Sequence, residues 1–463
     1  MRTSRDILFI APSAYPLGGV ASWLDYIVPG LRDRDWNVTL GLVEGRFHDV
    51  DAYLDAHPDG QVLRIPCGTG TPEGRVRQLL RAVRNVRPHI VVAVNIVDVA
   101  PAIERIRVTS EWSPRLAISL HAVQADLIGS VQRCEGVIDA VVCTNRLTCD
   151  LVAKLTSVVP CRIHYAPCGV NVNKVTPKER RASDGILKIA YVGRLERAQK
   201  RIEDIGAIAA ELDRRGIDYE LVIAGGGPDE EWLRVRLSDA TSCARVRFLG
   251  ALASVDLPEQ VYSRADALLI MSPCETGPIV AWEAMANGVA VVTSAYIGSG
   301  LEGSLEPGEN CLMFPVGDAA AAAECLERLR DQELRRRLLQ GGFNLVARRY
   351  SMTVSIENWS ATLEKITAKA PLSPPSPLLA HMMRMPSAGR LDRLFGTQVG
   401  ETIRELLGFK YDHCEPGGEW PHTRHCSALA EEAFWQLAMS IDRNSRRPVD
   451  SDAAQRVIAI PRS

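Results

Sequence analysis

Two glutamates that lie eight residues apart give the strongest chemical signal in the sequence. Glu275 and Glu283 stand in SPCETGPIVAWEAMANGVAVVTS, where Gly277 and Pro278 are typical of a helix start. Glu283 then falls in the second turn of an otherwise apolar helix. Carboxylates accept hydrogen bonds from sugar hydroxyls, and the first amides of a helix bind phosphate. The pattern predicts a sugar-nucleotide site, and the alternative is a capped helix with two solvated acids.

Two cations follow another expected strand end, in AYVGRLERAQKRIEDI. Arg194 comes directly after the strand, and Lys200 lies six residues later, near the next helix start. An arginine fork and a lysine point charge suit two adjacent phosphate groups. Because Arg197 and Arg201 stand in the same segment, a solvated basic loop is the alternative.

Glycines stand where three of the expected strands end. Glycine has no Cβ, so the backbone can approach a diphosphate closely at these positions. A tight turn needs glycine for the same reason, so loop geometry is the alternative. The candidates for donor contact are Gly18, Gly19, Gly193, Gly225 and Gly226.

The elements that must position these residues are short β-branched apolar runs that alternate with helical patterns. Continuous apolar runs indicate strands buried on both faces, hence parallel sheets with helices on both sides. In such sheets ligands bind at the carboxyl ends of the strands, which is where the residues above fall. The sequence therefore predicts two doubly wound α/β domains. The runs are 7–13, 38–44, 62–66, 90–95, 116–121, 140–144 and 163–169, then 187–193, 219–225, 246–250, 267–272, 289–295 and 311–315.

Polar and proline-rich segments divide the chain into domains. A polar break separates the two series of strands, and a proline-rich segment that no helix tolerates follows the second series. The predicted parts are a first domain at 1–172, a linker at 173–185, a second domain at 186–350, a helix at 351–368 that returns to the first domain, a second linker at 369–380 and a helical extension of unknown role at 381–463.

Helical patterns fill the end of the second domain and the extension. The stretch 319–366 is expected to be helical with a break near Gly341 and Gly342. In the extension, apolar residues keep near-helical spacing over 390–409 and 428–443, which predicts two amphipathic helices.

Composition and charge exclude several classes of protein. The chain has 463 residues, with 54 Lys and Arg against 56 Asp and Glu, so no global field draws it onto nucleic acid. The N-terminal apolar run is shorter than the ~7–15 residues of a signal-peptide core. The longest uncharged stretch, 284–301, carries too many polar residues for a membrane span. We therefore expect no transmembrane helix. The 12 cysteines include no CxxC pair, which fits a reducing compartment, so we expect a cytoplasmic protein.

Taken together, the motifs resemble the retaining glycosyltransferases of the GT-B class, specifically family 4, the group 1 glycosyltransferases. The resemblance covers about residues 5–366 and rests on the order and spacing of its markers. It implies two Rossmann-like domains that face a cleft, with the donor on the second domain and the acceptor on the first. The markers are Gly18-Gly19-Val20, His121 at the end of LAISLH, APCGVNV, VGRL with Lys200, LVIAGGGP, VRFLG and ETGPIVAWEAMANG followed by VAVVTS.

The resemblance also implies roles for individual residues. Arg194 and Lys200 match the cations that neutralise the donor phosphates. Glu275 matches the acid that contacts the donor sugar, and Glu283 the acid that holds the ribose hydroxyls. His121 matches a histidine that reaches the sugar from across the cleft. The remaining expected donor contacts are Gly18, Gly19, Gly193, Gly225, Gly226, Thr276, Gly277, Pro278, Ile279 and Val280.

The implied reaction moves a sugar from a nucleoside diphosphate sugar to an acceptor hydroxyl with retention at the anomeric carbon. No cofactor or metal is expected, because the cations and the helix amides neutralise the leaving diphosphate. Polysaccharide, glycolipid or glycoconjugate biosynthesis is the expected setting. The alternatives are an epimerase or phosphorylase of the same fold, or a catalytically silent sugar-nucleotide-binding scaffold.

The sequence departs from the family pattern in three places. Lys200-Arg201 stands where the family has Lys-Gly, which puts an extra cation beside the phosphate position. The segment IGSGLEGSLEPGENCLMF differs from the usual loop at the base side of the pocket. Residues 371–463 have no counterpart in the family core.

Two further clusters suggest partners. Three arginines along one helical face could touch an anionic membrane, and a solvated face is the alternative. A group of histidines and cysteines in the extension could hold zinc, although its spacing matches no familiar ligand pattern. The first cluster is Arg77, Arg81 and Arg84, and the second is His413, Cys414, His422, His425 and Cys426.

Overall fold

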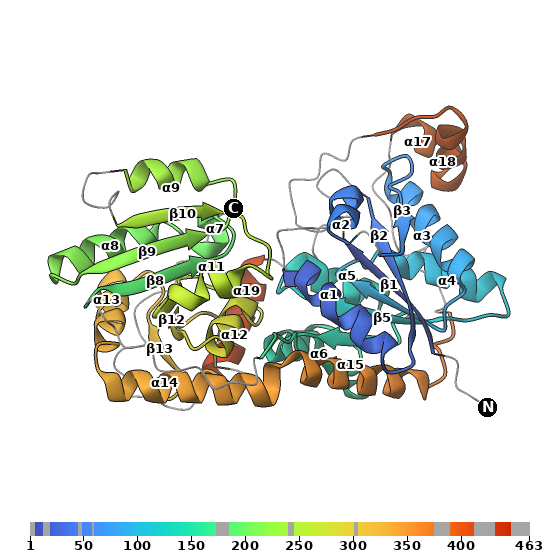
Figure 1. Cartoon of the computed structure of the whole chain (residues 1–463). Coiled ribbons are helices and arrows are strands. Elements are labelled where there is room, and N and C mark those ends of the chain that lie inside the picture. Colours follow the sequence, from blue (N-terminus) through green and yellow to red (C-terminus); the bar gives the residue numbers. More distant parts are fainter. Residues whose placement is uncertain are drawn as a thin grey trace. The chain divides into compact units, whose positions relative to one another are not determined.

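The chain forms two α/β units in its computed structural model (Figure 1). Unit 1 comprises Met1–Ala166 and Ile356–Leu437, and unit 2 comprises Pro167–Ser355 and Ala438–Ser463. The residues that the structure describes are 5–12, 19–44, 49–57, 60–172, 185–238, 245–300, 304–374, 389–411 and 431–445. The expected linker at 173–185 therefore lies outside the described residues except for Gly185.

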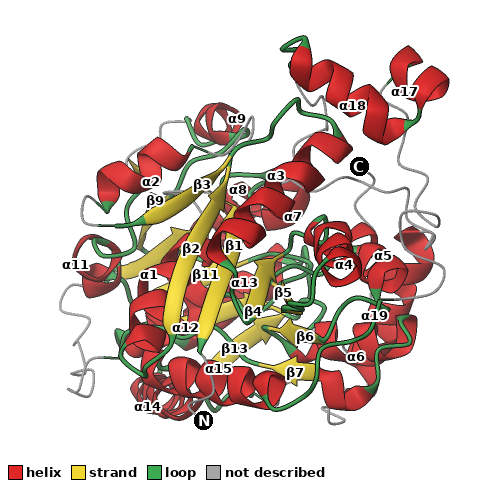
Figure 2. Cartoon of the chain, turned by 90° about the vertical axis from the view of Figure 1, so that its right-hand side faces the viewer, coloured by secondary structure: helices red, strands yellow, loops and turns green. Residues whose placement is uncertain are grey.

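Unit 1 is built on a parallel sheet in the order β3-β2-β1-β4-β5-β6-β7. Its central strands are buried along their whole length, because each is an unbroken apolar run with helices on both faces (Figure 2). The strands are β1 (Asp6–Pro12), β2 (Asn37–Val43), β3 (Val62–Ile65), β4 (Ile90–Val94), β5 (Arg115–Leu120), β6 (Ala140–Cys143) and β7 (Ile163–Tyr165).

The helices of unit 1 follow the strands that they cover. Side-chain caps fix several of them: the Thr71 hydroxyl accepts from the Gly74 amide, 2.9 Å away, at the start of the third helix. The helices are α1 (Gly19–Arg32), α2 (Val50–Ala56), α3 (Pro72–Val86), α4 (Val99–Thr109), α5 (Ala125–Cys134), α6 (Arg146–Leu155) and the short η1 (Pro160–Arg162).

Unit 2 repeats the design with a parallel sheet in the order β10-β9-β8-β11-β12-β13. The strands are β8 (Leu187–Val192), β9 (Tyr219–Ala224), β10 (Val246–Gly250), β11 (Ala267–Ile270), β12 (Ala290–Ser294) and β13 (Cys311–Phe314). The helices are α7 (Arg197–Lys200), α8 (Asp204–Arg214), α9 (Glu230–Arg236), α11 (Leu257–Gln260), η2 (Tyr262–Arg264), α12 (Ile279–Ala286), α13 (Ala319–Arg328), α14 (Gln332–Leu345) and η3 (Val346–Tyr350).

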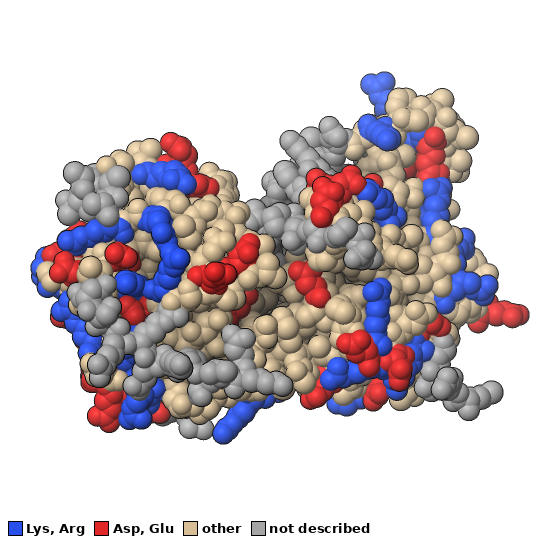
Figure 3. All heavy atoms as spheres, viewed as in Figure 1, with Lys and Arg blue, Asp and Glu red and all other residues tan. Residues whose placement is uncertain are grey.

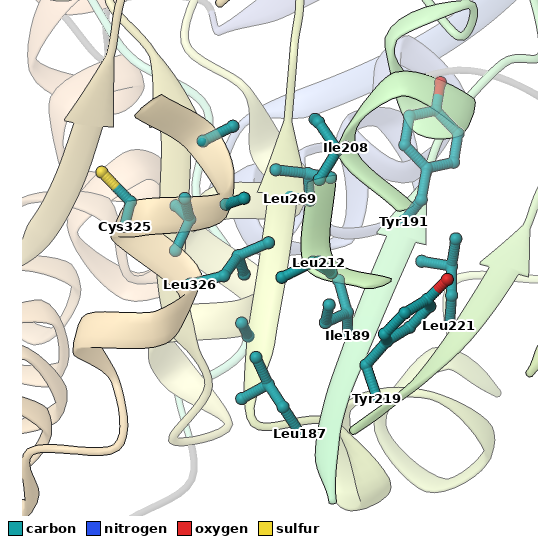
Figure 4. Packing of buried hydrophobic residues seen from close by; sticks show 14 of the residues in the cluster. Leu187, Ile189, Tyr191, Ile208, Leu212, Tyr219, Leu221, Leu269, Cys325 and Leu326 are labelled. Atoms are coloured by element: carbon teal, nitrogen blue, oxygen red, sulfur yellow. The ribbon is translucent and has the colours of Figure 1, made fainter. Parts of the chain in front are cut away.

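One apolar cluster forms the core on one face of this second sheet (Figure 4). Ile189 of β8 and Leu269 of β11 meet Ile208 and Leu212 of α8 and Leu326 of α13 there. Burial of such side chains stabilises the unit by roughly 1.5–3 kcal/mol each. The two sheets confirm the expected fold class of two doubly wound Rossmann-like domains.

The contacts place residues 167–172 with unit 2. The Val170 amide donates to the Tyr350 carbonyl oxygen at 2.7 Å, and the Met352 amide donates to the Val170 carbonyl oxygen at 2.9 Å. The helix α15 (Met352–Thr367) starts at this point in unit 2, and from Ile356 onward it belongs to unit 1.

In unit 1, α15 contributes to the core through one fully buried tryptophan. The ring centroid of Trp359 lies 5.1 Å from that of Trp23 in α1 and 6.1 Å from that of Phe9 in β1. The Trp36 indole also donates to the Ser360 hydroxyl at 3.0 Å. These contacts tie the helix to the first strand and the first helix of the unit.

The expected helix break near Gly341 and Gly342 is wrong, because both glycines lie inside α14. A Cβ on Gly341 would come within 2.1 Å of the Glu309 carbonyl oxygen, and one on Gly342 within 2.9 Å of the Met285 side chain. The glycines therefore serve close packing of the helix rather than its termination. The helical stretch is interrupted instead between Arg328 and Gln332 and again at Ser351, where the backbone is extended.

The extension is helical, but its first helix is not continuous as expected. Gly396, with a φ of +79°, separates α17 (Arg390–Phe395) from α18 (Thr397–Leu406), because a left-handed residue interrupts the helical hydrogen bonds. The second expected helix is α19 (Glu431–Ser445), which begins in unit 1 and belongs to unit 2 from Ala438. Among the described helices, none combines the length and apolar character needed to span a bilayer.

Candidate functional site

The site is built where the order of the unit 2 strands reverses, between β8 and β11. Lys200 ends the short helix α7 after β8, and Glu275 follows β11. The Lys200 ammonium donates to Glu275 Oε1 at 2.6 Å, with 22% of the lysine side chain and 8% of the glutamate side chain exposed. The structure thus brings together a cation and a carboxylate that are 75 residues apart in the sequence.

Arg194 lies at the same edge and is more exposed. Its guanidinium pairs with Glu196 at 3.1 Å and donates to the Gln199 side-chain oxygen at 3.0 Å. Both partners are local, so the guanidinium remains at the end of β8 with 37% of its side chain exposed. The position suits a phosphate contact of the kind predicted.

The neighbouring Arg201 does not add a second cation beside Lys200. Its guanidinium is held by both carboxylate oxygens of Asp204, at 2.8 and 2.9 Å. The residue has a φ of +49°, the left-handed conformation that glycine adopts most readily. A positive φ explains why a glycine suits this position, and the Asp204 contact explains how arginine is accommodated.

Glu283 lies in the second turn of α12, and its carboxylate meets a tyrosine that the sequence did not point to. The Tyr262 hydroxyl donates to Glu283 Oε2 at 2.9 Å. Burial raises the pKa of Glu283 to about 7, although the hydrogen bond from Tyr262 acts in the opposite direction. Burial of the Tyr262 phenol likewise raises its pKa well above the usual value, so Tyr262 stays a hydrogen-bond donor at neutral pH.

The residues beside Glu283 hold α12 in place. Trp282 stacks on Tyr350 of η3 with a centroid distance of 4.2 Å, and Met285 packs against Gly342 of α14. Gly277 has a φ of +88° just before the helix, and Pro278 caps it. The amides of Ile279 and Val280 belong to the first turn, where no partner exists within a helix. The predicted helix start at Gly277-Pro278 is therefore present, with Thr276 directly before it.

The glycine triplet after β9 has mixed roles. A Cβ on Gly225 would lie 1.8 Å from the Gly193 carbonyl oxygen, and one on Gly227 would lie 2.4 Å from the Leu195 carbonyl oxygen. Packing of the β8 and β9 strand ends therefore requires glycine at both positions. At Gly226 the nearest side-chain atom would be 3.6 Å away, so packing does not account for this glycine.

In unit 1, His121 stands at the carboxyl end of β5 in a neutral environment. Its Nε2 lies 2.9 Å from the Ser119 hydroxyl, and its amide donates to Asn95 Oδ1 at 2.8 Å. The ring contacts Trp23 edge to face at a centroid distance of 4.7 Å. Burial lowers the pKa of His121 to about 3, so the imidazole is uncharged at neutral pH.

The first turns of α1 pack close to His121. Gly19 is the first residue of α1, and Trp23, one turn later, carries the indole that touches His121. The predicted pair of Gly19 and His121 therefore shares one edge of the first sheet. Gly18 lies outside the described residues.

The sequence analysis missed three residues that shape these edges. Tyr262 follows α11 without any local motif, and Asn95 could have been noticed only as the polar residue that ends an apolar run. Asn95 adopts a φ of +54° and is fully buried. Asp442 of α19 accepts from the amides of Gly298 and Gly300, at 3.1 and 3.3 Å, in the loop after β12.

The arginines of α3 are engaged with protein groups. Arg77 pairs with Glu73 at 3.2 Å and with Glu405 of α18 at 2.9 Å, and Arg81 pairs with Glu405 at 3.2 Å. Arg84 donates to the Thr109 hydroxyl at 3.3 Å. Membrane contact through these three side chains stays a prediction, but α18 already compensates the charge of Arg77.

The structure does not describe the suggested zinc cluster, because its members lie in 412–430. Within the described ranges, no three His, Cys, Asp or Glu side chains are grouped as metal ligands. The described cysteines are free thiols.

A known protein family is similar to this chain in unit 2. Residues 174–344 match the family model of glycosyl transferases group 1. The alpha-D-kanosaminyltransferase of Streptomyces kanamyceticus is 31% identical over 179 residues, which are 38% of this chain and 45% of that protein. The chain spans about half the length of the curated relatives it matches.

Solved structures match over both units. The sucrose-phosphate synthase of Thermosynechococcus elongatus has a TM-score of 0.65 at 18% identity and covers 79% of this chain and 99% of its own. HepE of Anabaena in complex with UDP has a TM-score of 0.63 at 16% identity and covers 78% of this chain and 99% of its own. At these identities the likeness shows the fold, which is that of GT-B glycosyltransferases. The similarity to glycosyl transferases group 1 is thus shown for residues 174–344.

Proposed function

We propose that the chain moves a sugar from a nucleoside diphosphate sugar to an acceptor hydroxyl, with the donor bound at the carboxyl edge of unit 2. The Lys200–Glu275 ion pair at the strand reversal carries this proposal. A cation and a carboxylate in contact at that point offer one group for a phosphate and one for a sugar hydroxyl. The match to glycosyl transferases group 1 covers the same unit.

Lys200 and Arg194 would stabilise the diphosphate as it leaves. Negative charge grows on the phosphate oxygens when the bond to the sugar breaks, and fixed cations and helix amides lower the energy of that state. The first amides of α12, at Ile279 and Val280, would add to this stabilisation. Because protein groups supply the charge, we propose a metal-independent reaction, and we expect turnover to persist in the presence of a chelator.

Glu275 and Glu283 would divide the recognition of the donor between them. Glu275, already in contact with Lys200, would accept from a hydroxyl of the transferred sugar. Glu283 would accept from the ribose hydroxyls, and Gly226 would let the backbone approach the nucleotide. Tyr262 would hold the Glu283 carboxylate in position through its 2.9 Å hydrogen bond.

We also propose that the enzyme belongs to family 4 and retains the configuration of the anomeric carbon, because its motifs follow the order of that family. His121 would contact the sugar as a neutral imidazole, which can donate one hydrogen bond and accept another. Nuclear magnetic resonance of the first-formed product measures the anomeric configuration. A product of inverted configuration would contradict retention while leaving the donor site intact.

A cytoplasmic setting in polysaccharide, glycolipid or glycoconjugate biosynthesis completes the proposal. Free thiols at the described cysteines suit a reducing compartment.

The deciding experiment is a thermal-shift and turnover screen of the full chain against UDP-, GDP-, ADP- and dTDP-sugars. A ligand that binds only the folded state raises the melting temperature, so we expect one nucleotide class to shift it. Lys200→Ala should abolish that shift, whereas Arg197→Ala, in the same short helix, should keep it. If no donor shifts the melting temperature and none is turned over, the proposal fails.

The same screen separates the two alternatives. A silent scaffold would bind one donor without slow hydrolysis or transfer. An epimerase or a phosphorylase would release an epimer or a sugar phosphate instead of a glycoside. Chromatography of the products from a labelled donor distinguishes these outcomes.

A further inference from the structure

The tail hairpin, which we define as α17 and α18 with the adjoining residues to 411, packs beside α3 of unit 1 with its polar side inward (Figures 1 and 2). Glu401 of α18 is fully buried and accepts from the hydroxyls of Thr69 and Thr71. Arg404, also buried, pairs with Asp392 and Glu401. The polar residues of the hairpin thus make its contact with unit 1.

The apolar side of the tail hairpin faces away from unit 1. Val399, Ile403 and Leu406 have i, i+4, i+7 spacing and so share one face of α18, opposite Glu401 and Arg404. A surface of this kind marks an interaction site, because scattered single apolar residues are normal but a contiguous group is not. The exposed large side chains of this outer face are Leu394 (72%), Phe395 (55%), Val399 (52%), Leu406 (81%), Leu407 (64%) and Phe409 (46%).

The cations and the carboxylates of the tail hairpin lie on different sides. Its exposed cations are Arg390, Arg393 and Lys410, and Figure 3 shows Lys and Arg atoms beside tan atoms at the top of this region, with Asp and Glu atoms below them. Over the described residues 389–411 no carboxylate side chain is exposed, because Asp392 and Glu401 are buried and Glu405 is held by Arg77 and Arg81. The outer face therefore combines apolar and basic residues without acids.

We propose that the outer face of the tail hairpin docks on an anionic lipid surface. Apolar side chains enter the headgroup boundary, while flanking cations meet the negative surface potential. A second copy of this chain fits less well, because a symmetric contact would bring the same cations against each other. This inference does not depend on the proposed transfer reaction, since no donor-site residue takes part.

The test measures binding of the full chain to vesicles by co-sedimentation. Vesicles of equal parts phosphatidylcholine and phosphatidylglycerol should bind the protein, and pure phosphatidylcholine vesicles should bind it far less. Each basic residue near such a surface contributes about fivefold in affinity, so Arg390→Gln, Arg393→Gln and Lys410→Gln combined should weaken binding by about a hundredfold. Raising the salt concentration should weaken binding of the unchanged chain and affect the triple variant less.

A matched pair of variants isolates the apolar contribution. Val399→Glu and Gln398→Glu add the same charge at adjacent exposed positions, but only Val399 belongs to the outer face. We expect Val399→Glu to lose most vesicle binding and Gln398→Glu to lose little. Both positions are exposed, so both variants should unfold at the temperature of the unchanged chain, which circular dichroism checks.

Two outcomes would overturn the proposal. Absence of binding to anionic vesicles, or equal binding by the matched pair, would show that this face does not meet lipid. A dimer in sedimentation velocity that Val399→Glu dissociates, together with no vesicle binding, would assign the face to a second copy of the chain instead.

Discussion

In unit 2 the strands at the reversal of the sheet order, β8 and β11, are followed by Lys200 and Glu275 in a 2.6 Å ion pair. In unit 1 the corresponding strands, β1 and β4, are followed by Gly19 and the buried Asn95. Both sheets place these residues at the carboxyl edge, where doubly wound folds bind ligands. The same strand order around the reversal therefore carries a partly exposed ion pair in unit 2, whereas in unit 1 the ion pair close to Asn95, Asp98 with Arg75, is buried.

The histidine at the unit 1 edge is uncharged. His121 keeps an uncharged ring because burial lowers its pKa to about 3, and its neighbours are a serine, an asparagine and a tryptophan. A charged edge suits a diphosphate, whereas a neutral edge of donors and acceptors suits hydroxyl groups. In the proposed reaction, the chemistry of each edge, and not the fold, would separate a donor side from an acceptor side.

The largest effect is expected from removing the cation of the charged edge. Lys200→Ala should slow transfer by about 10²–10³, as is typical when one preorganised group that stabilises developing charge is lost. Single-turnover kinetics measures this step. Arg197→Ala is the control, because Arg197 lies in α7 with Lys200 but pairs with Asp229. Equal losses in both variants would support a merely basic loop and remove the contrast between the edges.

The next effect concerns the ionisation of Glu283. A carboxylate can accept from two ribose hydroxyls, and with a pKa of about 7 it becomes available only as the pH rises through neutrality. Nucleotide affinity should therefore increase between pH 6 and 8. Glu283→Gln should lower affinity at pH 8 by about tenfold or more, the usual contribution of hydrogen bonds to a charged group, and should flatten the pH profile.

The same variant changes the pH dependence of stability. The pKa of Glu283 is raised in the fold from 4.5 to about 7, so the stability that its protonated form contributes is lost as the pH rises through this window. The melting temperature of the unchanged chain should fall over that range more than that of Glu283→Gln. Glu231→Gln, which removes an exposed carboxylate of α9, should behave like the unchanged chain.

At the unit 1 edge we expect a smaller effect, which should change the rate of transfer but not the affinity for the nucleotide. His121→Ala should leave nucleotide affinity unchanged and reduce transfer by about five- to tenfold, because it removes a neutral hydrogen-bonding group. Isothermal titration with the nucleotide diphosphate and steady-state kinetics separate the two quantities. Loss of nucleotide binding in this variant would place His121 with the donor groups and blur the distinction between the edges.

The smallest effect should come from Asp442 of α19, which contacts the loop after β12. Asp442→Ala removes the acceptor for the amides of Gly298 and Gly300, so the loop after β12 loses its anchor. Because both hydrogen bonds are part-buried, we expect a loss of about 1 kcal/mol, the typical net contribution of a hydrogen bond. Differential scanning calorimetry should show a melting temperature lower by a few degrees. Asp442→Asn, which retains an oxygen acceptor, should lose less.

Local patterns were sufficient for the strands and for the start of α12. Short, largely apolar runs such as 187–193 and 267–272 became β8 and β11, because runs of this length between turn signals are typical of strands buried on both faces. Gly277 and Pro278 likewise mark a helix start through their own backbone preferences. These signals act within a few residues, so no knowledge of distant contacts was needed.

Local patterns misled where packing decides. Gly341 and Gly342 looked like a break, but the helix continues because Glu309 and Met285 leave no room for a Cβ. The apolar spacing over 390–409 predicted one amphipathic helix, but the structure has two helices there, and the buried side of α18 carries Glu401 and Arg404. Thr69 and Thr71, which precede α3, donate to Glu401, and Arg404 pairs with Asp392 and Glu401. The threonines lie 332 and 330 residues away from Glu401, so the local sequence could not reveal them.

By itself, the sequence determined two doubly wound domains, the strand ends at which chemistry was sought, and the residue types found there. Only the tertiary structure decided which of those residues meet: Lys200 with Glu275, Tyr262 with Glu283, and Asp442 with the loop after β12. The physical reason is that backbone preferences and periodicity act over a few residues. Hydrogen bonds and ion pairs between segments far apart in the chain instead require the sheet order that brings the segments together.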